Sequence, residues 1–176
     1  DAEVIDRVVA SIDNEAITLS DVHDAMQFSG KNISEKEIVE TLINRRLLLR
    51  EARNLKLSEI DKVEIDESVK RLKSKYPSEE AFRKAYNNIT KYDLHEHIRE
   101  SLIIERLIDY RIKAFIIITP EQIRDFYEKN RDKFGKEGFE DVRDEINQYL
   151  IEIETNKRLK ERLDILKRTV TIYRMF

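Results

Sequence analysis

Glycine and proline are so scarce in this chain that they limit what it can fold into. Its 176 residues contain 3 Gly and 2 Pro. A fold rich in β-strands needs many tight turns, and such turns depend on these residue types. The scarcity therefore predicts a mainly α-helical fold, and it argues against a Gly-rich phosphate-binding loop.

The charge and the apolar content exclude further classes of protein. Lys and Arg number 33 against 36 Asp and Glu, so the formal net charge is -3. A nucleic-acid binder that works through bulk electrostatics needs a positive excess, and we therefore expect no nucleic-acid partner. The apolar share of 40% is too high for a disordered chain. The longest apolar run, residues 114–118, is too short to span a membrane. Without Cys, the chain has no disulfide and no thiolate site.

The two ends of the sequence predict strands. Residues 4–19 alternate around Asp13-Asn14, a pair that suits a tight turn, and so predict a β-hairpin. Residues 169–176 are β-branched and aromatic in alternation, which is typical of a strand. A lone strand must pair its backbone groups with a partner. We therefore expect the two ends to meet in one small antiparallel sheet.

Between these strands, apolar residues recur at helical spacing and capping residues mark the helix starts. Ser34 and Glu37 form a Ser-x-x-Glu capping box, and Thr119-Pro120 is a second strong start signal. Ser20 is the predicted N-cap of the first helix. The predicted helices cover about 20–28, 34–56, 59–75, 78–86, 90–116, 119–130 and 139–167.

Two of the glycines mark a candidate boundary, because Gly135 and Gly138 enclose only two residues. We expect a helical region with the hairpin over residues 1–134 and a short linker over 135–138. Residues 139–176 would then supply a long helix and a strand that complete the same core domain.

No catalytic or metal-binding cluster emerges from the sequence. His95 and His97 are two residues apart, so on a helix they point about 200° away from each other, whereas a zinc-binding helix places them four apart. We interpret both, and His23, as solvent-facing. The carboxylates are interleaved with Lys and Arg, as on a solvated helix surface. We expect no catalytic residue, no metal and no cofactor, and therefore not an enzyme.

The order of five segments along the chain carries information about the protein family. They are Val8–Val22, with a strand, a turn, a strand and Ser-Asp-Val entering a helix; Leu42–Leu49; Ile118–Phe134; Phe139–Ile146; and Val170–Ile172. Together they resemble the SurA family of periplasmic chaperones, with its PpiD and PrsA-type relatives. Each motif is weak alone, and their order and spacing carry a resemblance that covers nearly the whole chain.

The resemblance implies an ATP-independent periplasmic chaperone that binds unfolded or outer-membrane polypeptides through an apolar cradle. It also implies secretion with removal of a signal peptide, which the start at Asp1 without Met would fit. In the family, a parvulin prolyl-isomerase domain normally separates the last two helical segments. Here only residues 135–138 lie between them, so isomerase activity does not carry over.

Met and aromatic side chains suit promiscuous binding, because they offer large and adaptable contact areas. Apolar stripes at helical spacing are more often core, so burial is the competing interpretation of each. The candidate client-binding residues are Met26, Phe28, Phe115, Ile116, Ile117, Phe126, Tyr127, Phe134 and Tyr149.

A second function class remains open. The same fold would serve as a non-catalytic assembly module that binds a partner, or a second copy of itself as a homodimer, by exchange of strands or helices.

Overall fold

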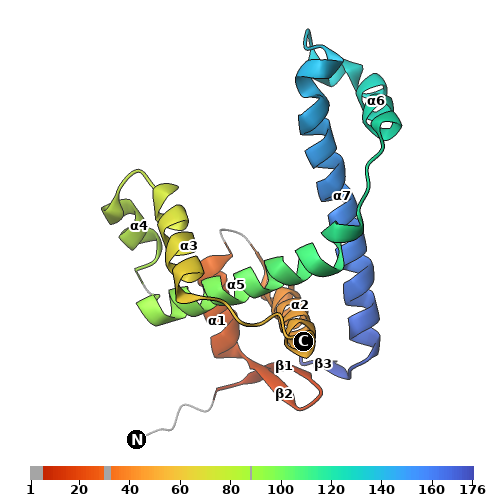
Figure 1. Cartoon of the computed structure of the whole chain (residues 1–176). Coiled ribbons are helices and arrows are strands. Elements are labelled where there is room, and N and C mark those ends of the chain that lie inside the picture. The colour runs from red at the N-terminus through yellow and green to blue at the C-terminus, as the bar shows by residue number, and fades with distance from the viewer. Residues whose placement is uncertain (1–5, 30–32, 88) are drawn as a thin grey trace, which may run out of the picture. The chain divides into compact units, whose positions relative to one another are not determined.

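The computed structural model describes residues 6–29, 33–87 and 89–176 (Figure 1). These residues form seven α-helices, two short 3₁₀-helices and three strands, so the predicted mainly α fold with a small antiparallel sheet is confirmed. In chain order they are β1 (Val8–Ile12), β2 (Glu15–Thr18), α1 (Leu19–Phe28), α2 (Glu35–Asn54), α3 (Lys62–Ser74), α4 (Glu79–Ala85), α5 (Lys91–Arg111), η1 (Lys113–Phe115), α6 (Pro120–Lys129), η2 (Arg131–Phe134), α7 (Phe139–Arg168) and β3 (Ile172–Arg174).

β1 is the central strand of the sheet and pairs antiparallel with both β2 and β3 (Figure 1). Ile12 lies opposite Ile172 in the β1–β3 pair. Beyond it, the Asp13 amide donates to the Thr171 carbonyl oxygen at 2.7 Å. The prediction that the two ends of the sequence meet in one sheet is therefore confirmed. The predicted start of the hairpin at Val4 lies outside the described residues.

Two compact units make up the chain. Unit 1 comprises Asp1–Leu107 and Leu163–Phe176, and unit 2 comprises Ile108–Arg162. The boundaries between the units fall within α5 and α7, whereas the expected layout placed its boundary at the two glycines.

The wide apolar arc of α2 accounts for the main core of unit 1. An arc broader than one stripe packs on two sides at once. The buried residues of this core come from β1, β2, α1 and α2, and the last residues of the chain pack against it. The buried set is Val9, Ala10, Ile12, Ile17, Val22, Ile38, Val39, Ile43 and Leu47, with Leu166, Val170 and Ile172 at its edge.

Helix starts follow the capping signals closely. The boxes at Ser34 and Thr119 form as predicted. The first helix differs from the prediction, because Thr18 and not Ser20 is its N-cap. The Asp21 amide donates to the Thr18 hydroxyl at 3.3 Å, and the Thr18 amide donates to the Asp21 carboxylate at 2.8 Å. A complete box of this kind satisfies two helix-end donors, and Ser20 has no carboxylate three residues later to form one.

Two helices are shorter than predicted, α3 at its start and α5 at its end. α3 begins at Lys62, with Asp61 as its N-cap, and not at residue 59. α5 ends at Arg111, although the apolar stripe continues through Ile116. Three consecutive isoleucines follow Phe115, and such β-branched residues lose side-chain freedom in a helix, which favours ending the helix before them.

Ion pairs join the C-terminal residues to the rest of unit 1. The Glu40 carboxylate on α2 binds the guanidinium of Arg174, with one contact at 3.1 Å, and the Lys167 ammonium at 3.5 Å. The Arg174 hydrogen bond is the main cause that lowers the pKa of Glu40. At the hairpin turn, the Asp13 carboxylate accepts from the Thr171 amide at 2.9 Å, which lowers the pKa of Asp13. The closing strand is therefore held by side chains as well as by backbone bonds.

The two faces of β3 allow a matched test of this closure. Ile172→Asp should lower the free energy of unfolding by about 2–4 kcal/mol, because it places an unpaired carboxylate against the core. Tyr173→Asp, on the exposed face of the same strand, should change it by less than about 1 kcal/mol. Urea unfolding followed by circular dichroism measures both, and equal effects would contradict the closure by β3.

Candidate functional site

Unit 2 is built around the packing of α6 against the first half of α7. Its buried core consists of Ile123 and Tyr127 from α6 and Val142 and Ile146 from α7, at spacings of four residues in each helix. Residues four apart lie on one helix face, so each helix presents one apolar stripe to the other.

The turn between these helices is fixed by three hydrogen bonds. The Tyr127 hydroxyl donates to the Glu137 carbonyl oxygen at 2.9 Å, and the Arg131 guanidinium donates to the same oxygen at 3.0 Å. The Gly138 amide donates to the Asp141 carboxylate at 2.9 Å, at the start of α7. Gly135 has a φ of +58°, which glycine adopts without strain. The segment that was expected to act as a linker is thus a specific turn between two packed helices.

A groove of about 560 Å³ runs over this packed pair, and we call it the aromatic groove. Its apolar lining comprises Phe126, Phe134, Ile146 and Tyr149. The ring centroids of Phe126 and Tyr149 are 5.4 Å apart, and those of Phe126 and Phe134 are 6.5 Å apart. These are normal separations for interacting rings. The groove therefore has a continuous aromatic wall contributed by α6, η2 and α7.

The apolar surface continues beyond the groove. Tyr149 is 48% exposed, and Ile153, one turn further along α7, is 45% exposed. Just before α6, Phe115 is 68% exposed and Ile117 is 84% exposed. The Arg158 guanidinium on α7 donates to the Phe115 carbonyl oxygen at 3.0 Å, which holds this segment beside α7. Unit 2 thus presents several large apolar side chains to solvent.

The polar residues at the edge of the aromatic groove are mainly acidic. Three carboxylates line it, from Glu137, Glu145 and Glu152, against one ammonium group from Lys133. Within the part of the chain that the structure describes, no ion pair neutralises these three carboxylates.

The nine predicted client-binding residues separate into four groups. Phe126, Phe134 and Tyr149 line the aromatic groove, while Met26, Phe115 and Ile117 are exposed outside it. Phe28 and Ile116 are half-buried. Tyr127 requires a correction, because its side chain is only 4% exposed and lies in the core of unit 2. Its neighbour Phe126 points to a different side of the same helix, and the periodicity alone did not separate them.

Sequence reasoning missed one apolar surface residue that belongs with this set. Ile153 lies four residues after Tyr149, and that spacing would have placed it beside the groove. Tyr110, near the end of α5, is also exposed, but it does not line the groove.

His97 requires a second correction, because it is half-buried and not solvent-facing. Its ring stacks on that of Phe28 with centroids 3.8 Å apart and an interplanar angle of 5°. Burial, followed by the charge of Arg45, lowers the pKa of His97 to about 4. His97 is therefore a neutral packing residue between α1 and α5 at pH 7.

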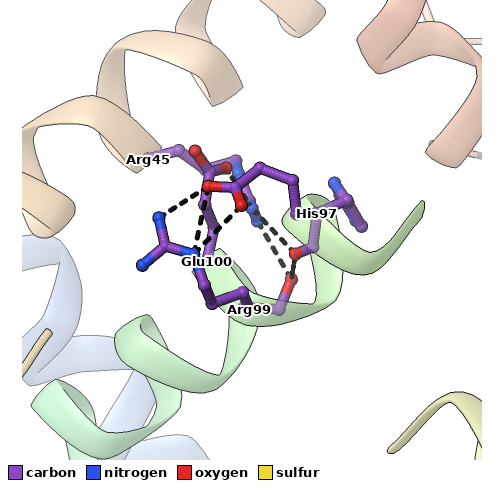
Figure 2. Close-up of polar contacts among 6 residues, drawn as sticks. Arg45, His97, Arg99 and Glu100 are labelled. Carbon is purple, nitrogen blue, oxygen red and sulfur yellow. Dashed lines mark hydrogen bonds and ion pairs between the residues drawn. The ribbon is translucent and has the colours of Figure 1, made fainter. Parts of the chain in front are cut away.

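Polar contacts join α2 to α5 beside His97 (Figure 2). The Arg45 guanidinium binds the Glu100 carboxylate at 2.9 Å and donates to the His97 carbonyl oxygen at 3.4 Å. Arg99 and Glu96 form a second pair at 2.6 Å on α5. The Arg45 contacts therefore join α2 to α5 beside the histidine.

Within the described residues, no three His, Cys, Asp or Glu side chains gather as metal ligands. Among the described helices, none combines the length and the apolar content needed to cross a bilayer.

Strands from the two ends of the chain pair in one small sheet, and the helices lie between them in the sequence. Comparison with solved structures confirms the SurA-like fold expected from the five segments. The chain is similar to a structure from Campylobacter jejuni, from the work on the virulence factor PEB4 and the periplasmic protein Cj1289, two structurally related SurA-like chaperones. The TM-score is 0.65 at 13% identity, over 96% of this chain and 99% of that chain. No protein-family model and no curated protein matches the sequence.

The buried histidine makes the stability of unit 1 depend on pH. The pKa of His97 is lowered from its ordinary value of 6.5 to about 4 on folding. Between these values the unfolded chain binds a proton that the folded chain does not, so stability falls as the pH falls from about 6.5 to about 4. His97→Phe keeps the stacked ring and removes the titration, and it should reduce the loss of Tm between pH 7 and pH 4.

Thermal melts over this pH range, monitored by circular dichroism, compare the variant with the natural chain. His23→Gln, at an exposed position of α1, is the control for the loss of a histidine. If His97→Phe and the natural chain lose Tm in parallel, His97 is not responsible for the dependence.

Proposed function

We propose that this protein is an ATP-independent, extracytoplasmic chaperone that binds unfolded polypeptides, including outer-membrane proteins before they fold. The observation that carries the proposal is the aromatic groove of unit 2, together with the exposed Ile153, Phe115 and Ile117. Exposed apolar surface of this kind is typical of an interaction site.

The physical driving force needs no nucleotide. An aromatic client side chain that buries about 150–250 Å² recovers roughly 4–6 kcal/mol at about 25 cal/mol per Å². Association itself costs about 4–15 kcal/mol of free energy, because the client loses translational and rotational freedom. Burial of one client side chain therefore gives a low affinity, and burial of several together gives an affinity sufficient to hold the client. This balance suits a chaperone, because the client must be able to leave and fold.

The fold supports the same class of function. The solved structure to which this chain is similar comes from work on SurA-like chaperones, of which Cj1289 is described as periplasmic. We therefore propose a periplasmic location and a chaperone role without prolyl-isomerase activity.

The test is suppression of aggregation of a chemically denatured β-barrel protein, without added nucleotide, followed by light scattering. The natural chain should slow aggregation at stoichiometric amounts. Tyr149→Ser combined with Ile153→Ser should reduce the protection several-fold, because it removes two exposed apolar contacts of the groove region and leaves the core intact.

A matched control has the same two substitution types elsewhere. Tyr110→Ser combined with Ile165→Ser replaces a tyrosine that is 58% exposed and an isoleucine that is 48% exposed, away from the groove. This pair should retain the protection. Equal losses in both pairs would reject the groove as the site, and no protection by the natural chain at several-fold excess would reject the chaperone function.

An assembly module is the second candidate, and the C-terminal end favours it. β3 is an edge strand, and Tyr173, Met175 and Phe176 are exposed there. An exposed edge with apolar residues is suited to pairing with another chain. Light scattering across a concentration series tests this function, which predicts a tight dimer without client protection.

A further inference from the structure

Unit 1 carries a second apolar pocket, distinct from the aromatic groove. It has a volume of about 590 Å³ and lies among α3, α4 and the first turns of α5; we call it the three-helix pocket. These helices are seen together in Figure 1. Val69, Phe82 and Leu94 line its base, and Lys73, Arg83 and Lys91 line its rim.

The base of this pocket is a packed apolar cluster. Val69, Phe82 and Leu94 are buried and belong to the second core of unit 1. Phe82 and Tyr86 lie with ring centroids 4.9 Å apart, and Tyr76 packs edge-on to both rings. Burial, followed by the hydrogen bond with Tyr76, raises the pKa of Tyr86 to about 12. The phenol is therefore uncharged, and the base of the pocket adds no negative charge.

The rim of the three-helix pocket is positively charged. Lys73, Arg83 and Lys91 line it, against the single carboxylate of Glu79. Lys73 lies 3.1 Å and Arg83 lies 3.9 Å from the same Glu79 oxygen, so two cations share one anion. Among the described residues, Lys91 forms no ion pair. An anion that enters this pocket would meet unneutralised positive charge.

The aromatic groove of unit 2 has the opposite charge balance, with three carboxylates and one ammonium group. The chain thus offers two apolar pockets of similar volume with opposite charge at their rims. Opposite charges attract a segment to the rim and like charges repel it, so such a difference selects among segments with the same apolar residues.

We propose that the three-helix pocket is a second polypeptide-binding site, which takes segments whose aromatic or aliphatic residues are flanked by Asp or Glu. The apolar side chain packs on the base formed by Phe82 and Leu94. The flanking carboxylates pair with Arg83 and Lys91 at the rim. This proposal rests on the proposed function, because both assume a polypeptide ligand. Binding at each pocket can nevertheless be tested without the other.

The experiment measures binding of two fluorescent peptides to the full chain by anisotropy. Both peptides have the same aromatic and aliphatic residues, flanked by Asp in one and by Lys in the other. The double variant Arg83→Glu with Lys91→Glu reverses the rim charge. We expect the Asp peptide to lose about tenfold or more in affinity for this variant, with a smaller loss at high salt.

The control variant reverses two charges outside the pocket. Lys70→Glu with Lys84→Glu changes α3 and α4 at exposed positions that do not line it, with the same change in net charge. It should bind the Asp peptide within about twofold of the natural chain. Circular dichroism melts check that both variants are folded, and Arg83→Gln with Lys91→Gln replaces the reversal if its Tm falls.

Three results would overturn the proposal. Equal losses for the two double variants would show an effect of net charge alone. Equal binding of the Asp peptide to the natural chain and to the rim variant would exclude the pocket. Equally tight binding of a peptide that keeps the Asp residues but has Ser in place of the aromatic and aliphatic residues would show a general anion site. None of these results would decide the proposed chaperone function. That function is tested separately, by protection of the denatured β-barrel protein and by the dependence of this protection on Tyr149 and Ile153.

Discussion

The pairing of β1 with β3 is the interaction on which unit 1 depends. It joins residues 8–12 to residues 172–174, so the main core of this unit closes only when the whole chain is in place. The Glu40 contacts with Arg174 and Lys167 add to it from the side of α2. Such a non-local closure costs loop entropy, which the burial of Ile12 and the adjacent apolar residues has to offset.

Unit 2 follows a different principle, because its core is formed by neighbours in sequence. α6 and α7 are joined by a short turn, and the hydrogen bonds of Tyr127 and Arg131 to Glu137 hold that turn closed. Each of these two helices buries one apolar stripe against the other, so its remaining apolar residues are not covered by a neighbouring helix. Phe126 and Tyr149 are such residues, and the aromatic groove is a direct consequence of a unit too small to enclose them.

In the proposed function, the aromatic groove and the three-helix pocket would combine general and selective binding. Apolar walls recover a similar free energy from any large side chain, and this part of the interaction is indifferent to sequence. The charges at the rims differ, acidic around the aromatic groove and basic around the three-helix pocket. Together they favour segments of different composition while keeping each individual contact weak.

Local signals along the chain were sufficient to predict most of the helices and strands. The boxes at Ser34 and Thr119, the Asp13-Asn14 turn and the terminal strand depend on neighbouring residues, so reading along the chain was sufficient to predict them. Only the tertiary structure decided which apolar residues are exposed. Phe126 and Tyr127 are adjacent aromatic residues, yet Phe126 lines a groove and Tyr127 lies in the core. The ring of His97 stacks on that of Phe28, which belongs to a helix far away in the sequence. Periodicity defines the apolar face of a helix, but burial depends on whether another element covers that face, and this is set by contacts between residues far apart in the sequence.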